Sequence, residues 1–290
     1  MSSPELGAFA FVGGRSNGRA TLERLGDFNR RHILEQEGLN AWGVWEFSDW
    51  DGLAQHVRKG FEYAKQRCTA YPRYVVQRRL FPAFLDMYLP IVKSLRFGHP
   101  LAVEQDADAL PDLSFGPVIH RTKASELHAQ FAEAIAGGGI PLFQGDLADG
   151  SFIDGQDTSA YFAPATVLEP PRSWSLYHSE PFGPLDSIML VDTEAEFIAA
   201  MNVSNGCLVA SVATDDMKFA ERVREETAAF KFGVNTPRSR GDREEAFGGL
   251  GASWRGAFVG GDLLVDAVTD GDRPIYGNFK GGSLIPPALD

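Results

Sequence analysis

Cys68 is the side chain best suited to covalent chemistry, and it lies in residues 60–73, between an expected helix and an expected strand. A junction of this kind exposes a side chain while its flanking elements hold it in place, and nearby backbone amides favour the thiolate, the reactive form of cysteine. Lys65, Arg67 and Arg73 add positive potential that acts in the same direction. The alternative is that Cys68 is a small apolar side chain without reactivity.

Other catalytic chemistries find little support in the sequence. The histidines show no H-E-x-x-H spacing and the chain has no C-x-x-C pair, so no metal site is predicted. The nearest match to G-x-S-x-G begins at Gly251, but its last glycine comes one residue late. Residues 13–19 form a glycine-rich turn that is neither G-x-G-x-x-G nor a P-loop. Cys207 falls in an apolar run and is expected to be an inert core thiol.

Composition narrows the class of protein. The 290 residues are 44% hydrophobic and 23% charged, which is enough apolar material for a substantial core. A net charge of -12 disfavours nucleic-acid and membrane partners, because so acidic a surface repels phosphate backbones and anionic lipid. No apolar run approaches the length of a membrane span, and two cysteines are too few for a disulfide framework. We therefore expect a soluble cytoplasmic protein.

Expected strands and helices alternate along the chain, which predicts an α/β fold with a largely parallel sheet flanked by helices. The expected strands are residues 8–12, 31–35, 41–47, 73–77, 161–168, 187–191, 207–213 and 231–235. Expected helices include residues 20–28, 193–201 and 215–228. The charged residues 238–245 are expected to form a solvated loop.

The helix that precedes Cys68 is expected to begin at Ser48, an N-cap serine with Asp51 three residues later, and to end near Gln66. Its apolar side chains recur at helical spacing, which predicts a face that packs into the core. These side chains are Leu53, Val57, Phe61 and Ala64.

Several segments, in the right order, resemble the aldehyde dehydrogenase superfamily. Residues 11–19 are similar to its F-T-G-S-x-x-x-G-R turn, residues 34–40 to its L-E-L-G-G-K-N stretch, and residues 66–73 to its G-Q-x-C-x-x-x-x-R segment. Weaker matches follow at residues 115–119 (M-G-P-L-I), 164–168 (P-T-V-L), 180–184 (E-x-F-G-P), and at Asn235, 247–249 and Ser253 (N…F-G-G…S). Together these motifs cover roughly residues 9–260.

This resemblance implies NAD(P)-dependent oxidation of a small aldehyde to a carboxylic acid, through a cysteine thiohemiacetal and then a thioester. Cys68 would be the nucleophile and Glu35, 33 positions earlier, the general base. The cofactor, NAD or NADP, would be bound by Gly13, Gly18, Glu180 and Phe182. In the resembled motif Glu180 holds the nicotinamide ribose and Phe182 packs by the ring. The alternative for Glu35 is a capping or ion-paired acid near Arg30 or Arg31.

Three residues depart from the family pattern, because Glu37, Lys65 and Trp254 stand where the family has glycine. These departures bear on the substrate class and the cofactor geometry. Two other classes of function also remain open. One is a catalytically silent member of the fold that serves as a structural or oligomerisation protein. The other is a cofactor-independent thiol hydrolase that uses Cys68.

By the same resemblance, residues 1–36 would be the remaining part of a coenzyme-binding domain, 37–250 the catalytic domain, and 251–290 a C-terminal tail that serves as an oligomerisation segment. A homo-oligomer is expected. In the family, most of the coenzyme-binding domain precedes the F-T-G-S turn. The chain is therefore expected to be a partial form that binds NAD(P) weakly and is nearly inactive alone.

Overall fold

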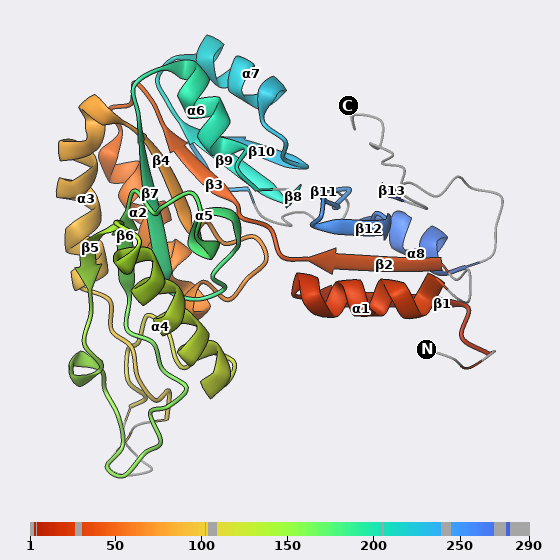
Figure 1. The fold of residues 1–290 in the computed structure, drawn as a ribbon, viewed down its shortest axis with the longest axis horizontal. Coiled ribbons are helices and arrows are strands. Elements are labelled where there is room, and N and C mark those ends of the chain that lie inside the picture. Colours follow the sequence, from red (N-terminus) through yellow and green to blue (C-terminus); the bar gives the residue numbers. More distant parts are fainter. Residues whose placement is uncertain are drawn as a thin grey trace.

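Strands gather into two sheets in this computed structural model, which describes residues 3, 5–26, 31–101, 103, 109–204, 206–238, 245–269 and 277–278. The larger sheet and its helices lie on one side of the molecule, and the smaller sheet projects from it (Figure 1). No helix in the described part of the chain is long and apolar enough to cross a membrane.

The larger sheet has the strand order β10-β9-β3-β4-β7-β6-β5, and its neighbouring strands are parallel except β5 and β6. Its strands are β3 (Ala41–Val44), β4 (Arg73–Gln77), β5 (Ile140–Gln144), β6 (Ala165–Leu168), β7 (Leu185–Val191), β9 (Val209–Ala213) and β10 (Lys231–Val234). The α/β class with a largely parallel sheet is thereby confirmed. Parallel neighbours need crossover connections, and the intervening helices supply them.

Helices cover both faces of this sheet (Figure 1). In β4, Tyr74 and Val76 pack with α2 and α3, whereas Val75 packs with α6 and α7. This alternation follows from the two-residue period of a strand, which points successive side chains to opposite faces. The helices are α2 (Trp50–Gly60), α3 (Phe81–Lys93), α4 (Arg121–Ala136), α5 (Ser175–His178), α6 (Glu194–Met201) and α7 (Met217–Glu226). Short 3-10 turns occur at Glu62–Lys65, Arg78–Leu80 and Leu147–Asp149.

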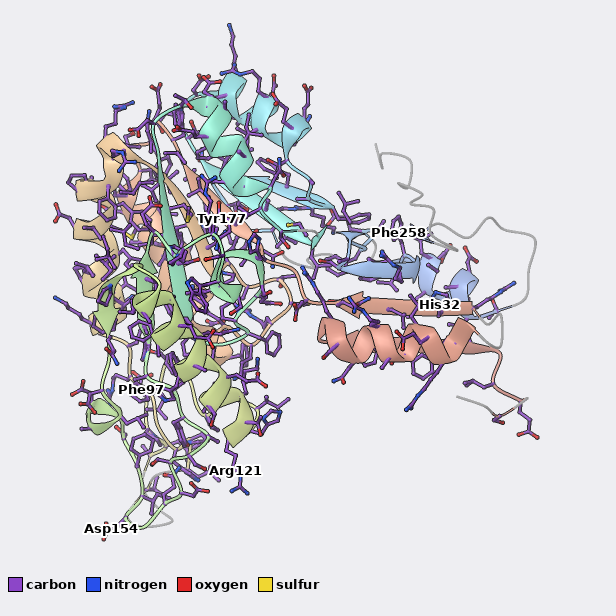
Figure 2. All side chains as sticks on the ribbon, viewed as in Figure 1. His32, Phe97, Arg121, Asp154, Tyr177 and Phe258 are labelled. Atoms are coloured by element: carbon purple, nitrogen blue, oxygen red, sulfur yellow. The ribbon has the colours of Figure 1, made fainter. Side chains whose placement is uncertain are left out.

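The smaller sheet joins the two ends of the chain. Its order is β1-β2-β12-β13, with β1 and β2 parallel and β12 antiparallel to both of its neighbours. The strands are β1 (Ala8–Gly13), β2 (Arg31–Gln36), β12 (Trp254–Ala257) and β13 (Gly277–Asn278), with helices α1 (Arg15–Gly26) and α8 (Leu263–Val268). His32 and Phe258 mark this part of the molecule in Figure 2. The described part of the expected tail, residues 251–269 and 277–278, thus joins the sheet that residues 1–36 form. The other residues of the tail lie outside the described residues, and its predicted oligomerisation role stays a prediction.

Several expected boundaries are wrong. Asp49 rather than Ser48 caps α2, because its carboxylate accepts the N–H of Gly52 at 3.0 Å. That helix ends at Gly60, short of Gln66, where the backbone turns into a left-handed segment. The apolar face is still buried as predicted, since both Phe61 and Ala64 stay within the core.

The expected strand at residues 207–213 is divided. Gly206–Cys207 forms β8, which pairs with β11 (Leu250–Gly251), and only Val209–Ala213 continues into the larger sheet as β9. The antiparallel edge strand β5 had no expected counterpart. Residues 145–160 lie in loops as expected, with Asp154 at the far end of the molecule (Figure 2).

Candidate active site

A left-handed turn presents Cys68. Tyr63, Ala64 and Lys65 have φ angles of 57°, 53° and 55°. L-residues lose about 1–2 kcal/mol each in this conformation, so surrounding contacts must hold the turn. Cys68 follows three residues later, and its side chain is partly buried.

A buried ion pair between Lys65 and Asp186 holds this turn against β7. Lys65 is 1% exposed, and its Nζ lies 2.6 Å from Oδ1 of Asp186. The same nitrogen donates to the Tyr71 carbonyl at 3.0 Å, and the Tyr88 hydroxyl donates to Asp186 at 2.8 Å. Burial lowers the pKa of Lys65 and raises that of Asp186, and the attraction between the two charges opposes both shifts. The sequence showed Lys65 in place of glycine but gave no sign of its partner.

Asn40 anchors the backbone of the nucleophile segment by hydrogen bonds. Its buried amide Nδ2 donates to the carbonyls of Cys68 (2.7 Å) and Ala70 (2.8 Å). Its Oδ1 accepts the backbone N–H groups of Leu208 (3.3 Å) and Val209 (3.1 Å). One side chain therefore fixes the carbonyl of the cysteine to the start of β9.

Gln66 connects the segment on its other side to residues 115–119. Its Nε2 donates to the Pro117 carbonyl at 3.1 Å, and its Oε1 accepts the Ile119 N–H at 2.7 Å. Gln66 thus attaches the backbone around Cys68 to residues 117 and 119, and Asn40 attaches it to residues 208 and 209. Both residues belong to the motifs that carried the family resemblance.

Glu35 reaches the site from the smaller sheet. It lies in β2, opposite Val12 of β1 and opposite Trp254 of β12, and is 8% exposed. The buried Ser253 extends this anchoring, because its carbonyl accepts the Gln36 N–H at 2.8 Å and its hydroxyl donates to the carbonyl of residue 37 at 2.8 Å. The position of Glu35 therefore depends on pairing between the two ends of the chain.

The structure brings Cys68, Glu35 and Glu180 together. Burial raises the pKa of the Cys68 thiol above its ordinary value, and the charge of Glu35, its hydrogen bond to the thiol and the charge of Glu180 act in the same direction. The predicted lowering of the thiol pKa by neighbouring cations is therefore wrong. Two cations are engaged elsewhere: Lys65 pairs with Asp186, and the buried Arg73 donates from NH1 to the Tyr177 carbonyl at 2.9 Å.

The alternative for Glu35 is a capping or ion-paired acid near Arg30 or Arg31. The Arg31 guanidinium donates to the carbonyls of Asp266, at 3.5 Å, and Thr269. Arg30 lies outside the described residues. The Glu35 carboxyl group lies beside the Cys68 thiol, whose pKa it raises.

Glu180 is a buried carboxylate with one free oxygen. Its Oε2 accepts the Gly38 N–H at 3.3 Å, while Oε1 has no hydrogen-bond partner among the described residues. Burial raises the pKa of Glu180 well above its ordinary value, and the charge of Glu37 adds to the shift; the Gly38 hydrogen bond, Lys123 and Arg15 oppose it. A buried acceptor without a donor is costly, so this oxygen is suited to a ligand hydroxyl.

Of the other predicted cofactor residues, Gly13 and Gly18 lie in β1 and α1, and Phe182 lies two residues after Glu180. Gly13 ends β1, where a Cβ would lie 2.6 Å from the Phe11 ring, and Gly18 lies in α1, where a Cβ would lie 2.5 Å from the Gln36 side chain. Both glycines thus permit close packing within β1, α1 and β2. Phe182 follows Glu180 in a left-handed conformation, with φ of 52°.

Arg15, in the glycine-rich segment of residues 13–19, forms an ion pair with Glu37. Arg15 Nε lies 3.4 Å from Oε1 of Glu37, and its NH2 donates to Ser204 at 3.1 Å. Glu37 is one of the departures from the family pattern, and here its charge is matched by an arginine. Among the described residues, no group of three or more His, Cys, Asp or Glu side chains could hold a metal ion.

Chemically, the arrangement pairs a nucleophile with a base. A carboxylate beside a thiol can take its proton, and the same carboxylate can later activate water against a thioester at that sulfur. Cys207 lacks such neighbours: burial raises its pKa to about 12, and its Sγ donates to the Val209 carbonyl at 3.0 Å. The expectation of an inert core thiol at position 207 agrees with its burial.

Comparison with known proteins places the chain among related sequences. A model of the aldehyde dehydrogenase family matches residues 1–269. The 3,6-anhydro-alpha-L-galactose dehydrogenase of Vibrio sp. (strain EJY3) is 26% identical over 222 residues, which are 76% of this chain and 43% of that protein. The chain therefore spans less than half the length of this curated relative.

Solved structures share the fold. The NAD-dependent aldehyde dehydrogenase from Sinorhizobium meliloti matches with a TM-score of 0.79 at 23% identity, over 93% of this chain and 50% of that one. The NADP-dependent glyceraldehyde-3-phosphate dehydrogenase from Bacillus halodurans C-125, complexed with NADP, matches with a TM-score of 0.76 at 22% identity, over 92% and 52%. At these identities the likeness establishes the fold alone.

Proposed function

The chain belongs to the aldehyde dehydrogenase family, and on that premise we propose that it oxidises an aldehyde to a carboxylic acid with Cys68 as nucleophile and Glu35 as base. The observation that carries this proposal is the position of the Glu35 carboxyl group beside the Cys68 thiol, whose pKa it raises. It places a proton acceptor beside the one of the two cysteines that is not fully buried.

The first step is addition to the carbonyl. Glu35 takes the thiol proton, and the sulfur of Cys68 forms a bond to the aldehyde carbon while the carbonyl electron pair moves to oxygen. The product is a tetrahedral thiohemiacetal. Because the thiol pKa is raised, the thiolate is a minor species at neutral pH, and Glu35 can accept the proton as the sulfur adds to the carbonyl carbon.

A nicotinamide cofactor, when bound, supplies a hydride acceptor for oxidation of the thiohemiacetal carbon. The residues present fit such a group, because Glu180 offers a buried carboxylate oxygen without a donor, which a ribose hydroxyl would satisfy. Phe182, two residues further on, would lie against the ring. The choice between NAD and NADP stays open.

Hydrolysis of the thioester again uses Glu35. The carboxylate accepts a proton from water, the water oxygen attacks the thioester carbon, and the C–S bond breaks to return the Cys68 sulfur. The product leaves as a carboxylic acid. The two roles of Glu35 are compatible because it lies beside the sulfur at which both steps occur.

An aryl ester tests the sulfur chemistry without a cofactor, since attack on an activated ester yields the same kind of thioester. We expect para-nitrophenyl acetate to give an acetyl adduct on Cys68, detectable by peptide mass spectrometry, and slow turnover. Cys68→Ala should abolish the adduct, and Glu35→Gln should let it accumulate. An aldehyde with NAD or NADP then tests oxidation through the absorbance of the reduced nicotinamide.

The outcomes separate the three classes of function. Because the chain is expected to bind NAD(P) weakly, oxidation is assayed at cofactor concentrations raised until the rate no longer changes. Ester turnover through Cys68 with no nicotinamide reduction under those conditions would support a cofactor-independent thiol hydrolase. Absence of an adduct on Cys68 in the folded protein would support a catalytically silent structural role. Ester turnover that survives Cys68→Ala would show that position 68 is not the nucleophile.

A further inference from the structure

A cavity of about 330 Å³ lies against the nucleophile segment. Its wall includes Arg67 and Thr69, the two sequence neighbours of Cys68, together with the end of α2 and the segment that follows β10. Adjacent Cα atoms are about 3.8 Å apart, so the wall begins one residue away from the proposed nucleophile. The volume is at the lower end of the range for small-molecule sites, which suits a short ligand.

The charge of this cavity is opposite to that of the whole chain. Among the described residues that line it, three are cationic, namely Lys59, Arg67 and Arg238, and none is an aspartate or a glutamate. The chain as a whole has a net charge of -12. Positive charge gathered in a concave wall attracts anions, and low-dielectric walls strengthen that attraction.

Hydrogen-bond donors are also in excess here. Trp42 Nε1, Arg67 Nε and Arg238 Nε belong to side chains of the wall, and each is buried without an acceptor among the described residues. Trp42 is only 2% exposed. Buried donors are normally satisfied, so a wall with this surplus is suited to a ligand that brings acceptors.

Tyr71, which also lines the cavity, holds the backbone of Arg238 in place. Its N–H donates to the Tyr71 hydroxyl at 2.8 Å, and that hydroxyl donates back to the Arg238 carbonyl at 3.0 Å. The guanidinium also pairs with Glu245, which is shared with Lys231. The expected solvated loop, residues 238–245, lies outside the described residues except at its ends, where the Arg238 side chain is 35% exposed. Arg67 stacks over the Tyr63 ring, with 5.5 Å to the centroid.

We propose that this cavity binds an anionic group, a carboxylate or a phosphate, at the far end of the aldehyde substrate while the carbonyl carbon reaches Cys68. The inference rests on the proposed function, because it takes Cys68 as the nucleophile. Arg67 and Arg238 are the main anion contacts, since an arginine presents a planar fork of donors that matches both anions. Lys59 adds charge at the end of α2.

Two alkylating reagents of nearly equal size test the charge preference at Cys68. Iodoacetate carries a carboxylate and iodoacetamide is neutral, so the ratio of their rates, relative to the ratio for free cysteine, reports anion attraction. We expect this relative ratio to be at least three in the wild-type chain. Arg67→Gln and Arg238→Gln should each reduce it, and their combination should bring it to one or below, because Glu35 and Glu180 repel anions from the thiol.

Matched controls keep the result interpretable. Arg58 lies one residue from Lys59 but donates to Ser94 on the surface, so Arg58→Gln should leave the ratio unchanged. Arg67→Lys keeps the charge and should retain most of the preference. Thermal unfolding of each variant verifies that it is folded, and added salt should weaken the preference by screening.

Aldehydes then distinguish the two anions. Length-matched carboxylate-bearing, phosphate-bearing and neutral aldehydes are compared as protectants of Cys68 against iodoacetamide, and one anionic class should protect at concentrations at least tenfold lower than the neutral one. Equal protection by the neutral aldehyde, with a relative alkylation ratio of one in the wild type, overturns the anion site and leaves the nucleophile intact. Failure of both reagents to alkylate Cys68 overturns the site and the proposed function together.

Discussion

The carboxyl group of Glu35 lies beside the Cys68 thiol and raises its pKa, although the two residues come from segments that lead into different sheets of the molecule. Cys68 precedes β4 of the larger sheet, whereas Glu35 lies in β2 of the smaller one. This contact raises the thiol pKa and also places a base at the sulfur. The same carboxylate therefore lowers the thiolate population in the free protein and can accept the thiol proton during turnover.

Glu35→Gln is expected to accelerate alkylation of Cys68 while slowing hydrolysis of its thioester. The wild-type thiol has a pKa above its ordinary 9.0, so its alkylation rate should keep rising with pH beyond that value. Removing the Glu35 charge lowers the pKa. Each unit of decrease gives tenfold more thiolate but a weaker nucleophile, a net gain of about threefold at pH 8.

The pH–rate profile with iodoacetamide measures this effect, and acetyl-adduct lifetime measures hydrolysis. Glu46→Gln is the control, since Glu46 pairs with Arg79 on the surface. An unchanged profile in Glu35→Gln would contradict the contact between the two side chains.

Lys65→Met should be strongly destabilising. It leaves Asp186 buried at 0% exposure without its cation, and breaking a buried ion pair in this way costs about 3–5 kcal/mol. The double variant Lys65→Gly, Asp186→Leu should recover most of that loss, because it removes both charges and relieves the φ of 55° at position 65. Denaturant unfolding of the two variants checks the difference. If the double variant were as unstable as Lys65→Met, the pairing argument would be wrong.

Asn40→Ala should lower the free energy of unfolding by about 2–3 kcal/mol, because it leaves buried carbonyls at residues 68 and 70 and the N–H groups of 208 and 209 without partners. Hydrogen exchange should also increase across residues 66–71, since their anchor is lost. Asn202→Ala is the matched control. Asn202 makes two comparable backbone contacts, to Glu226 and Ala228, but at the surface, where water replaces them.

Gly256→Ala should disrupt the pairing of β12 with β2. Gly256 has a φ of 85°, and an added Cβ would lie 1.9 Å from the carbonyl oxygen of His32. We expect a loss of about 3 kcal/mol in stability. Displacement of β2 should also move Glu35, so the alkylation profile of Cys68 should shift in the same direction as in Glu35→Gln. Gly60→Ala, where no atom lies within 4 Å of the new Cβ, should be neutral or slightly stabilising.

Local patterns were sufficient for much of the fold. The helical spacing of Leu53 and Val57 predicted a buried face, and the helix expected at residues 193–201 is observed as α6, with Thr193 as its cap. Strand β4 was predicted with its observed bounds. Each of these features depends on neighbours within a few residues, which a sequence displays directly.

The functional residues were identified by ordered motifs, but their electrostatics were not. Lys65 and Arg73 appeared to be cations that would lower the Cys68 pKa, yet both charges are directed into the core. The partner of Lys65 is Asp186, 121 positions away. A side chain's charge affects its neighbours in space, and the sequence does not show which neighbours those are.

By itself, the sequence determined the family, the fold class and the identity of the nucleophile and base candidates, because short motifs and periodic apolar faces encode local conformation. Tertiary structure alone decided that Trp254 pairs opposite Glu35, that a left-handed turn presents Cys68, and that Arg67 and Arg238 meet in one cavity. Those arrangements arise when segments distant in sequence pack together, and burial and charge at each atom depend on that packing.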